Sequence, residues 1–247
     1  MFRASQLEEK PVLDLYGFLR KEKLLMDDPT DYYEETEFAG ETNIVSLRVP
    51  KHIDERIRWI FDKVRKDRDL LGFSPEVIRM PISSGKLLRK MHKHGLMLLY
   101  DMEPVQNMML VEEALKRFSF KLLDPTSTTY CKECVQLYNS VVGHLDYVGS
   151  TIQSILPYES NEYRKVSFRA YPKWKSKAKV LSGIMRTSEY TVNRLALVLS
   201  VATVVDIGIS IKDVYRFLED IAEDYIELVR PLDKIYVEIT GQKLLEV

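Results

Sequence analysis

The sequence predicts a mainly α-helical protein that contains one short β-ribbon. Two observations lead to this fold class: an alternating segment occurs twice, and a pair of helical patterns follows each copy. Apolar residues make up 45% of the chain and charged residues 30%, which is typical of a folded, soluble protein. The 247 residues are enough for one or two domains, each with its own core.

The two strands are predicted from an internal repeat. Residues 44–51 read I-V-S-L-R-V-P-K and residues 165–173 read K-V-S-F-R-A-Y-P-K, and they align at an offset of 121 positions. In both copies apolar side chains alternate with serine and arginine, and a proline follows. This period-two pattern is typical of a short strand with one buried face. We therefore expect strands over residues 45–49 and 166–170.

The first strand leads into two predicted helices. Apolar residues at helical spacing indicate an amphipathic helix that runs to about Asp69: Ile53, Ile57, Ile60 and Val64. Gly72 lies in the break that follows, and Ser74-Pro75-Glu76 is a favourable start for a second helix. We expect Pro81 and Gly85 to interrupt that second helix.

The second strand is followed by the same arrangement. After Pro172, four apolar residues share one face of a predicted helix: Trp174, Ala178, Leu181 and Met185. A row of lysines lies between them: Lys173, Lys175, Lys177 and Lys179. Thr187-Ser188 then provides the cap of a strongly apolar helix from Glu189 to about Val205.

The charges are distributed unevenly along the chain. Residues 48–94 carry 13 Lys and Arg against 6 Asp and Glu, a net charge of +7, and residues 162–186 carry 8 against 1, again +7. Residues 1–42 have a net charge of −6 and residues 206–247 a net charge of −5. Two basic blocks in an otherwise acidic chain indicate a localised anionic partner, although solvated helix faces would look the same.

The strand V-S-L-R-V-P followed by helix, turn and helix resembles the ribbon-helix-helix DNA-binding family. Two copies in one chain are similar to the tandem ribbon-helix-helix transcription regulators of filamentous viruses of hyperthermophilic archaea. The resemblance implies a viral protein that binds double-stranded DNA in the host cytoplasm. A heat-adapted source agrees with the low amide content, since Asn and Gln together number 10.

The resemblance also implies which residues contact DNA. Outward side chains of the ribbon would reach base edges in the major groove: Ile44, Ser46 and Arg48 from the first strand, and Lys165, Ser167 and Arg169 from the second. The starts of the second helices, at Ser74 and Ser188, would bind backbone phosphates, with Lys173 and Lys175 as further phosphate contacts. Arginine donates two hydrogen bonds to guanine, and a helix N-terminus favours an anion. Ile44 could contact a thymine methyl group or simply pack.

One chain supplies both strands that the family needs. We therefore expect an intramolecular pseudo-dimer, because closing the connecting loop costs little chain entropy. A homodimer that pairs like strands is the alternative. The expected organisation is an acidic segment (1–42), a first ribbon-helix-helix unit (43–94), a helical insert (95–162), a second unit (163–206), and a C-terminal helix and tail (207–247).

The insert and the tail are predicted to be helical. We expect helices over residues 103–123 and 127–156, separated by Asp124-Pro125-Thr126, and an acidic amphipathic helix over residues 210–229. Three methionines are expected to fill the core: Met102, Met108 and Met109. Cys131-x-x-Cys134 is interpreted as two buried or partly buried thiols, with a zinc site or a redox role as the alternatives.

The motifs of common enzyme classes are missing from the sequence. It contains no P-loop, no G-x-S-x-G, no H-E-x-x-H and no dinucleotide fingerprint. The longest apolar stretch has 11 residues, too few to cross a bilayer, and no signal peptide is visible. We therefore expect a cytoplasmic, non-enzymatic, sequence-specific regulator without metal or cofactor. The region upstream of its own gene is a natural operator, and self-association on DNA is left open. A non-specific DNA-coating or virion protein and, less favoured, a metal-dependent nuclease are the alternatives.

Overall fold

The computed structural model describes residues 44–66, 84–156 and 162–245. In chain order the elements are β1 (Ile44–Pro50), α3 (Lys51–Lys66), α4 (Ser84–Asp101), α5 (Glu103–Phe118), the π-helical turn η3 (Ser119–Leu123), α6 (Cys134–Ser150), the 3-10 turn η4 (Thr151–Ile155), β2 (Tyr163–Arg169), α7 (Pro172–Ile184), α8 (Glu189–Val204) and α9 (Ile211–Thr240). The prediction of a mainly helical protein with a short β-ribbon is confirmed. None of the described helices is long and apolar enough to span a membrane.

The described elements form two compact units. The ribbon unit contains β1, α3, β2, α8 and most of α4 and α7. The bundle unit contains α5, α6 and most of α9. Both predicted strands and the helices that follow them therefore belong to the same unit, although a long segment separates them in the sequence.

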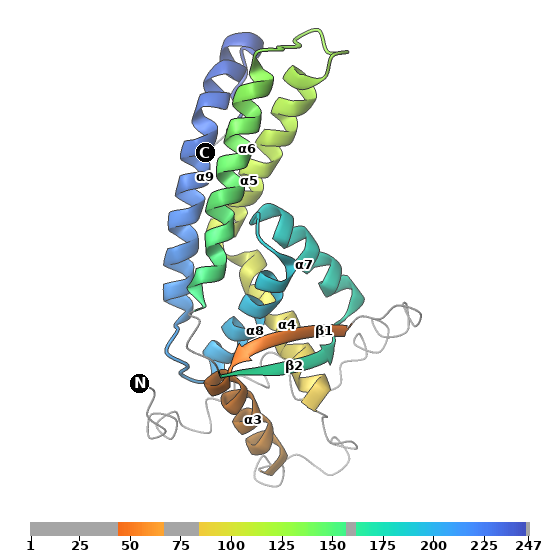
Figure 1. Ribbon diagram of the computed structural model, residues 1–247, viewed down its shortest axis with the longest axis vertical. Coiled ribbons are helices and arrows are strands. Elements are labelled where there is room, and N and C mark those ends of the chain that lie inside the picture. The colour runs from red at the N-terminus through yellow and green to blue at the C-terminus, as the bar shows by residue number, and fades with distance from the viewer. Residues whose placement is uncertain (1–43, 67–83, 157–161, 246–247) are drawn as a thin grey trace. The chain divides into compact units, whose positions relative to one another are not determined.

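The two strands pair with each other in an antiparallel ribbon (Figure 1). Ser46 lies opposite Ser167, next to the central pair of Leu47 and Val166. Side chains along each strand alternate between an exposed face and an inward face. The inward side chains are buried, namely Val45, Leu47, Val166 and Phe168. At one end the Lys51 N–H donates to the carbonyl oxygen of Glu162 at 3.0 Å, and the two side chains form an ion pair at 2.7 Å. These contacts close the ribbon where α3 begins.

The core of the ribbon unit is built around α8, which packs against β1. Every side chain from Thr191 to Val201 is buried, and most of them are apolar. The backbones of α4 and α8 approach each other at Gly95. A Cβ atom at this position would lie 1.7 Å from the carbonyl oxygen of Ala196. Only glycine fits this crossing.

The helices after the second strand occur where the sequence predicts them. Helix α7 buries Trp174, Ala178 and Leu181 on one face, and α8 begins directly after Ser188. Of the two helices predicted after the first strand, α3 is described to Lys66. Ser74 and Pro81 lie outside the described residues.

The expected interruption at Gly85 falls at the edge of the described residues. Gly85 is the second residue of α4, and the residues before Ser84 lie outside the described part of the chain. The first backbone N–H groups of a helix have no partner within the helix, so glycine disturbs little there.

The bundle unit consists of α5, α6 and α9, which run side by side in Figure 1. The ring of Phe118 stacks on Tyr138, with ring centroids 5.9 Å apart, and lies 6.3 Å from Tyr236. These rings join the three helices. The prediction that Met102 and Met108 fill the core is confirmed, and Met109 is half-buried.

Two helix boundaries in this unit differ from the prediction. Helix α6 begins at Cys134 and not at residue 127, because Asp124 Oδ1 accepts hydrogen bonds from the backbone and hydroxyl of Thr126 and starts a turn. Helix α9 continues to Thr240 instead of ending near residue 229. Its buried face extends through Leu232 and Tyr236, beyond the exposed Pro231. The packing of this buried face therefore keeps α9 helical beyond Pro231.

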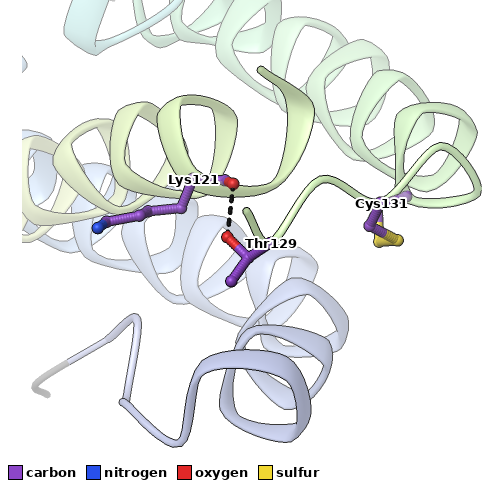
Figure 2. The surroundings of a disulfide bond; sticks show 4 residues. Lys121, Thr129 and Cys131 are labelled. Carbon is purple, nitrogen blue, oxygen red and sulfur yellow. Dashed lines mark hydrogen bonds between the residues drawn. A yellow bond between two sulfur atoms is a disulfide. The ribbon is translucent and has the colours of Figure 1, made fainter. Parts of the chain in front are cut away.

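The interpretation of the two cysteines as thiols is wrong, because Cys131 and Cys134 form a disulfide (Figure 2). The turn before α6 holds their Cα atoms 5.4 Å apart, within the range that a disulfide can bridge. The Cys131 N–H donates to the carbonyl oxygen of Leu122 at 2.8 Å, and Thr129 Oγ1 donates to that of Lys121 at 2.8 Å. The sulfur atoms are thus bonded to each other rather than to zinc.

Candidate nucleic-acid interface

The outer face of the ribbon carries all six side chains that the sequence predicts to contact bases. All six are exposed, and the residues that lie between them along each strand are buried; the six are Ile44, Ser46, Arg48, Lys165, Ser167 and Arg169. Ile44 is 55% exposed, so it does not pack in the core. Strand alternation therefore places two hydroxyls, three cations and one apolar side chain on a single surface.

A pair of serines occupies the middle of this face. Ser46 Oγ and Ser167 Oγ are 2.9 Å apart and hydrogen-bonded. The two residues are also equivalent in the sequence repeat, since they are 121 positions apart. Equivalent residues lie opposite each other only at this position of the register. The pair therefore marks a local pseudo-two-fold axis of the ribbon.

The two ends of the outer face are chemically different. At one end Arg48 lies opposite Lys165, and we call this the Arg48 end. At the other end Ile44 lies opposite Arg169. The charge is therefore unequal on the two sides of the pseudo-two-fold axis. The Arg48 end carries two positive charges, and the opposite end carries one.

The start of α8 lies beside the Arg48 end. The Tyr190 hydroxyl accepts a hydrogen bond from the Arg48 N–H at 2.9 Å and donates one to the Arg48 carbonyl oxygen at 3.3 Å. Tyr190 is the second residue of α8, and Ser188 is exposed directly before the helix. The N-terminus of a helix attracts anions. One predicted phosphate contact, Ser188, directly precedes this helix in the sequence, while the other, Ser74, lies outside the described residues.

A cavity of about 530 Å³ lies between the Arg48 end and α8, and we call it the Arg194 cavity. Its lining includes three cations and two tyrosines: Arg48, Lys165, Arg194, Tyr163 and Tyr190, together with Ser46. Arg194 is only 2% exposed, and its guanidinium lies 6.0 Å from the centroid of the Tyr163 ring. Among the residues that the structure describes, none that lines the cavity is a carboxylate.

Sequence reasoning missed three residues of this cavity: Tyr163, Tyr190 and Arg194. A signal was present for Arg194, because it lies directly before the apolar run Leu195–Val205 within the same predicted helix. Arginine is almost never fully buried without compensating contacts. An arginine inside such a helix therefore indicates a site where other groups compensate the buried charge.

The four lysines of α7 do not share one environment. Lys173 and Lys179 are exposed, whereas Lys175 and Lys177 are half-buried. Lys177 Nζ lies 4.4 Å from the centroid of the Trp174 ring, close enough for a cation–π interaction. Residues two apart on a helix point in different directions, so the row cannot act as a single surface.

One arginine of the second basic block, Arg186, is paired with two carboxylates. Arg186 Nε lies 2.6 Å from Glu112 Oε1, and Arg186 Nη1 lies 2.7 Å from Asp146 Oδ1. Both acids come from the bundle unit's helices, and Arg186 belongs to the same unit. The net charge of the block therefore overstates the charge available to an anionic partner.

Two buried histidines hold α4 against α8 behind the ribbon. His92 Nε2 and Asn193 Oδ1 are 2.6 Å apart, and His94 Nδ1 and Ser200 Oγ are 3.1 Å apart. Burial lowers the pKa of His92 to about 4, so its ring is neutral near pH 7. The same ring lies 5.1 Å from Phe168, on the inner face of β2. The outer face therefore sits on a tightly packed layer.

The chain matches no protein-family model, no curated protein and no solved structure. Among the described residues, no group of three or more His, Cys, Asp or Glu side chains is placed to hold a metal ion.

Proposed function

We propose that the protein is a sequence-specific, double-stranded DNA-binding transcription regulator of the ribbon-helix-helix type. The observation that carries this proposal is the intramolecular ribbon, whose outer face presents three opposed pairs of side chains around Ser46 and Ser167. In this proposal the ribbon enters the major groove, and the protein performs no catalytic step. The sequence resemblance adds a viral origin and the cytoplasm of an archaeal host.

The dimensions of the ribbon support this mode of binding. Two strands lie about 4.8 Å apart, and the major groove, about 12 Å wide, admits a two-stranded ribbon. Arg48 and Arg169 would each donate to the O6 and N7 atoms of a guanine. The central serines can donate or accept, and Ile44 would contact a thymine methyl group.

Contacts outside the ribbon would set its position on the duplex. Ser188 at the start of α8 would bind a backbone phosphate, as would Lys173 and Lys175 on α7. We assign the same role to Ser74 by analogy with Ser188. Such contacts supply affinity and register but no sequence information.

The two ends of the outer face imply an imperfect palindrome as the operator. A pseudo-two-fold protein surface reads two half-sites of opposite orientation, as symmetric dimers do. Here the half-site under Arg48 and Lys165 would be richer in hydrogen-bond acceptors than the half-site under Ile44 and Arg169. The region upstream of the protein's own gene is the first place to search.

The proposal is tested by selecting binding sites from a pool of random duplexes with the full chain. We expect an enriched, imperfectly palindromic sequence that binds about 10³-fold or more tightly than random DNA at physiological salt. A double variant, Ser46→Ala with Arg48→Ala, should lose the enrichment. Selection that yields no preferred sequence with the wild-type chain would sink the proposal.

The basic blocks favour a second candidate, a protein that coats DNA without reading its sequence. Such binding is almost wholly electrostatic and decreases steeply with salt. The two candidates separate in a salt titration on the selected duplex and on random DNA. A regulator retains a large affinity ratio at high salt, whereas a coating protein shows similar affinities and similar slopes on both.

A further inference from the structure

We propose that the Arg194 cavity binds the phosphate group of a nucleotide-class ligand and that this occupancy competes with DNA at the Arg48 end. The binding half of the inference depends only on the cavity. The competition half depends on the proposed function, because it requires Arg48 and Lys165 to contact DNA.

The size of the cavity indicates an organic ligand rather than a bare inorganic anion. Its volume of about 530 Å³ lies within the range of small-molecule sites, about 300–1,000 Å³. A phosphate ion alone would leave most of this space to water. A sugar phosphate or nucleotide would fill more of it and would bury apolar surface against the tyrosines.

The charge of the lining favours a phosphate over a carboxylate. Arg48, Lys165 and Arg194 contribute three positive charges to one cavity. A phosphate monoester carries about −1.5 to −2 at pH 7, whereas a carboxylate carries a single charge. Of the three cations, the buried Arg194 guanidinium should attract a phosphate most strongly, because electrostatic attraction is stronger where water is excluded. Its planar donors also match two phosphate oxygens at once.

The tyrosines supply a surface for a flat organic group. The Tyr190 hydroxyl is engaged by the backbone of Arg48, which fixes the ring, and the residue is 40% exposed. An exposed aromatic face can stack on a nucleobase. The Tyr163 ring instead lies beside the guanidinium of Arg194, which orients the cation.

Competition follows from shared residues. Ser46, Arg48 and Lys165 belong both to the outer face of the ribbon and to the lining of the cavity. A ligand that holds Arg48 and Lys165 withdraws them from base edges. The phosphate group itself could come from a free nucleotide or from the backbone of bound DNA, and the experiment has to separate these two sources.

Binding is measured on the full chain by isothermal titration with deoxyadenosine 5′-monophosphate, deoxyadenosine and inorganic phosphate. We expect the monophosphate to bind, inorganic phosphate to bind more weakly, and deoxyadenosine not to bind. Arg194→Met should weaken monophosphate binding about tenfold or more, and Arg194→Lys should restore part of it. The control is Arg216→Met, which removes an exposed arginine of α9 in the bundle unit and should change nothing.

A second arm identifies the source of the phosphate. The monophosphate is titrated into a complex with the selected duplex, and the salt slope of duplex binding is compared for wild type and Arg194→Met. Displacement of DNA, with an unchanged salt slope in the variant, supports a free nucleotide. A slope reduced by about 1 without monophosphate binding supports a DNA phosphate in the cavity.

Monophosphate binding by a chain that binds no DNA supports the cavity assignment and removes the proposed function. If the wild-type chain does not bind the monophosphate and Arg194→Met does not change the salt slope of duplex binding, the inference is overturned. If circular dichroism shows that Arg194→Met is unfolded, Lys165→Met replaces it in the monophosphate titration alone, because Lys165 is exposed and its loss leaves the core intact.

Discussion

Ser46 and Ser167 hydrogen-bond through their hydroxyls at 2.9 Å, although 120 residues separate them in the chain. The contact joins the two copies of the sequence repeat at equivalent positions. The ribbon is therefore formed by one chain, and its two strands can be tested directly against each other.

A cross-link should report this pairing. In Ser46→Cys/Ser167→Cys, directly opposed strand residues bring their Cβ atoms within reach of a disulfide. We expect mild oxidation to give an intrachain bond, seen as a monomer with altered mobility and confirmed by peptide mass mapping. Each single cysteine variant is the control for exchange with Cys131 and Cys134. Cross-links found only between chains would contradict the intramolecular ribbon.

The two ribbon arginines should contribute specificity. Arg48→Ala or Arg169→Ala is expected to cost about 1–3 kcal/mol of binding free energy on the selected duplex and much less on random DNA. Fluorescence anisotropy with both duplexes measures the difference. Arg216→Ala, on α9, is the matched control. Equal losses on both duplexes would reassign the arginines as phosphate contacts.

The lysines of α7 should differ in their contribution to the salt dependence. Each phosphate contact that is lost lowers the salt slope by about 1, so we expect that value for Lys173→Gln and for Lys175→Gln. Lys177→Gln should change the slope less, because its ammonium lies on the Trp174 ring. Titrations of the three variants against sodium chloride provide the comparison. Replacement of all four lysines should remove fewer than four units of slope, and a larger loss would argue that the row acts as one surface.

His92 should make the folded state sensitive to acid. Its pKa is about 4 in the folded protein and 6.5 when unperturbed, so the unfolded chain takes up a proton first as the pH falls. This contribution to the free energy of unfolding is fully present above about pH 6.5 and is lost progressively down to pH 4, by about 3 kcal/mol. Urea unfolding between pH 7.5 and 4 measures the effect. The loss should be smaller in His92→Gln and unchanged in His144→Gln, whose ring is exposed on α6. Identical profiles for wild type and His92→Gln would exclude this role.

Gly95 should be intolerant of a side chain. In Gly95→Ala the new methyl group would overlap the carbonyl oxygen of Ala196, so the helices must move apart. We expect a loss of at least about 1–3 kcal/mol in the free energy of unfolding. Gly143→Ala is the control, because no atom lies within 4 Å of a Cβ there and alanine favours a helix by about 0.5–1 kcal/mol. A stable Gly95→Ala variant would show that the crossing can relax.

The strands and the helices after Pro172 could be predicted because their signals are local. The alternation of Val45, Leu47 and Val49 specifies a buried face, whatever covers it. The continuation of α9 beyond Pro231 could not be predicted in this way. It depends on the packing of Leu232 and Tyr236, which is a property of the folded bundle.

The sequence predicts only the part of the candidate site that depends on a local pattern. Period-two alternation was enough to place Ser46 and Arg48 on an outer face. The cavity required the start of α8 to lie beside β1, and no local pattern contains that contact. The disulfide was missed for the same reason, because two cysteines three apart pair only where the turn holds their Cα atoms close enough.

The contact between Tyr190 and Arg48 also bears on how the molecule avoids aggregation. A two-stranded ribbon has two outer edges, and unpaired backbone groups on such an edge invite a strand from another molecule. The Tyr190 hydroxyl occupies both the N–H and the carbonyl oxygen of Arg48, which are the groups that an incoming strand would need. A side chain of α8 thus protects the edge of β1. Its removal would expose a template for polymerisation at the surface proposed to read DNA.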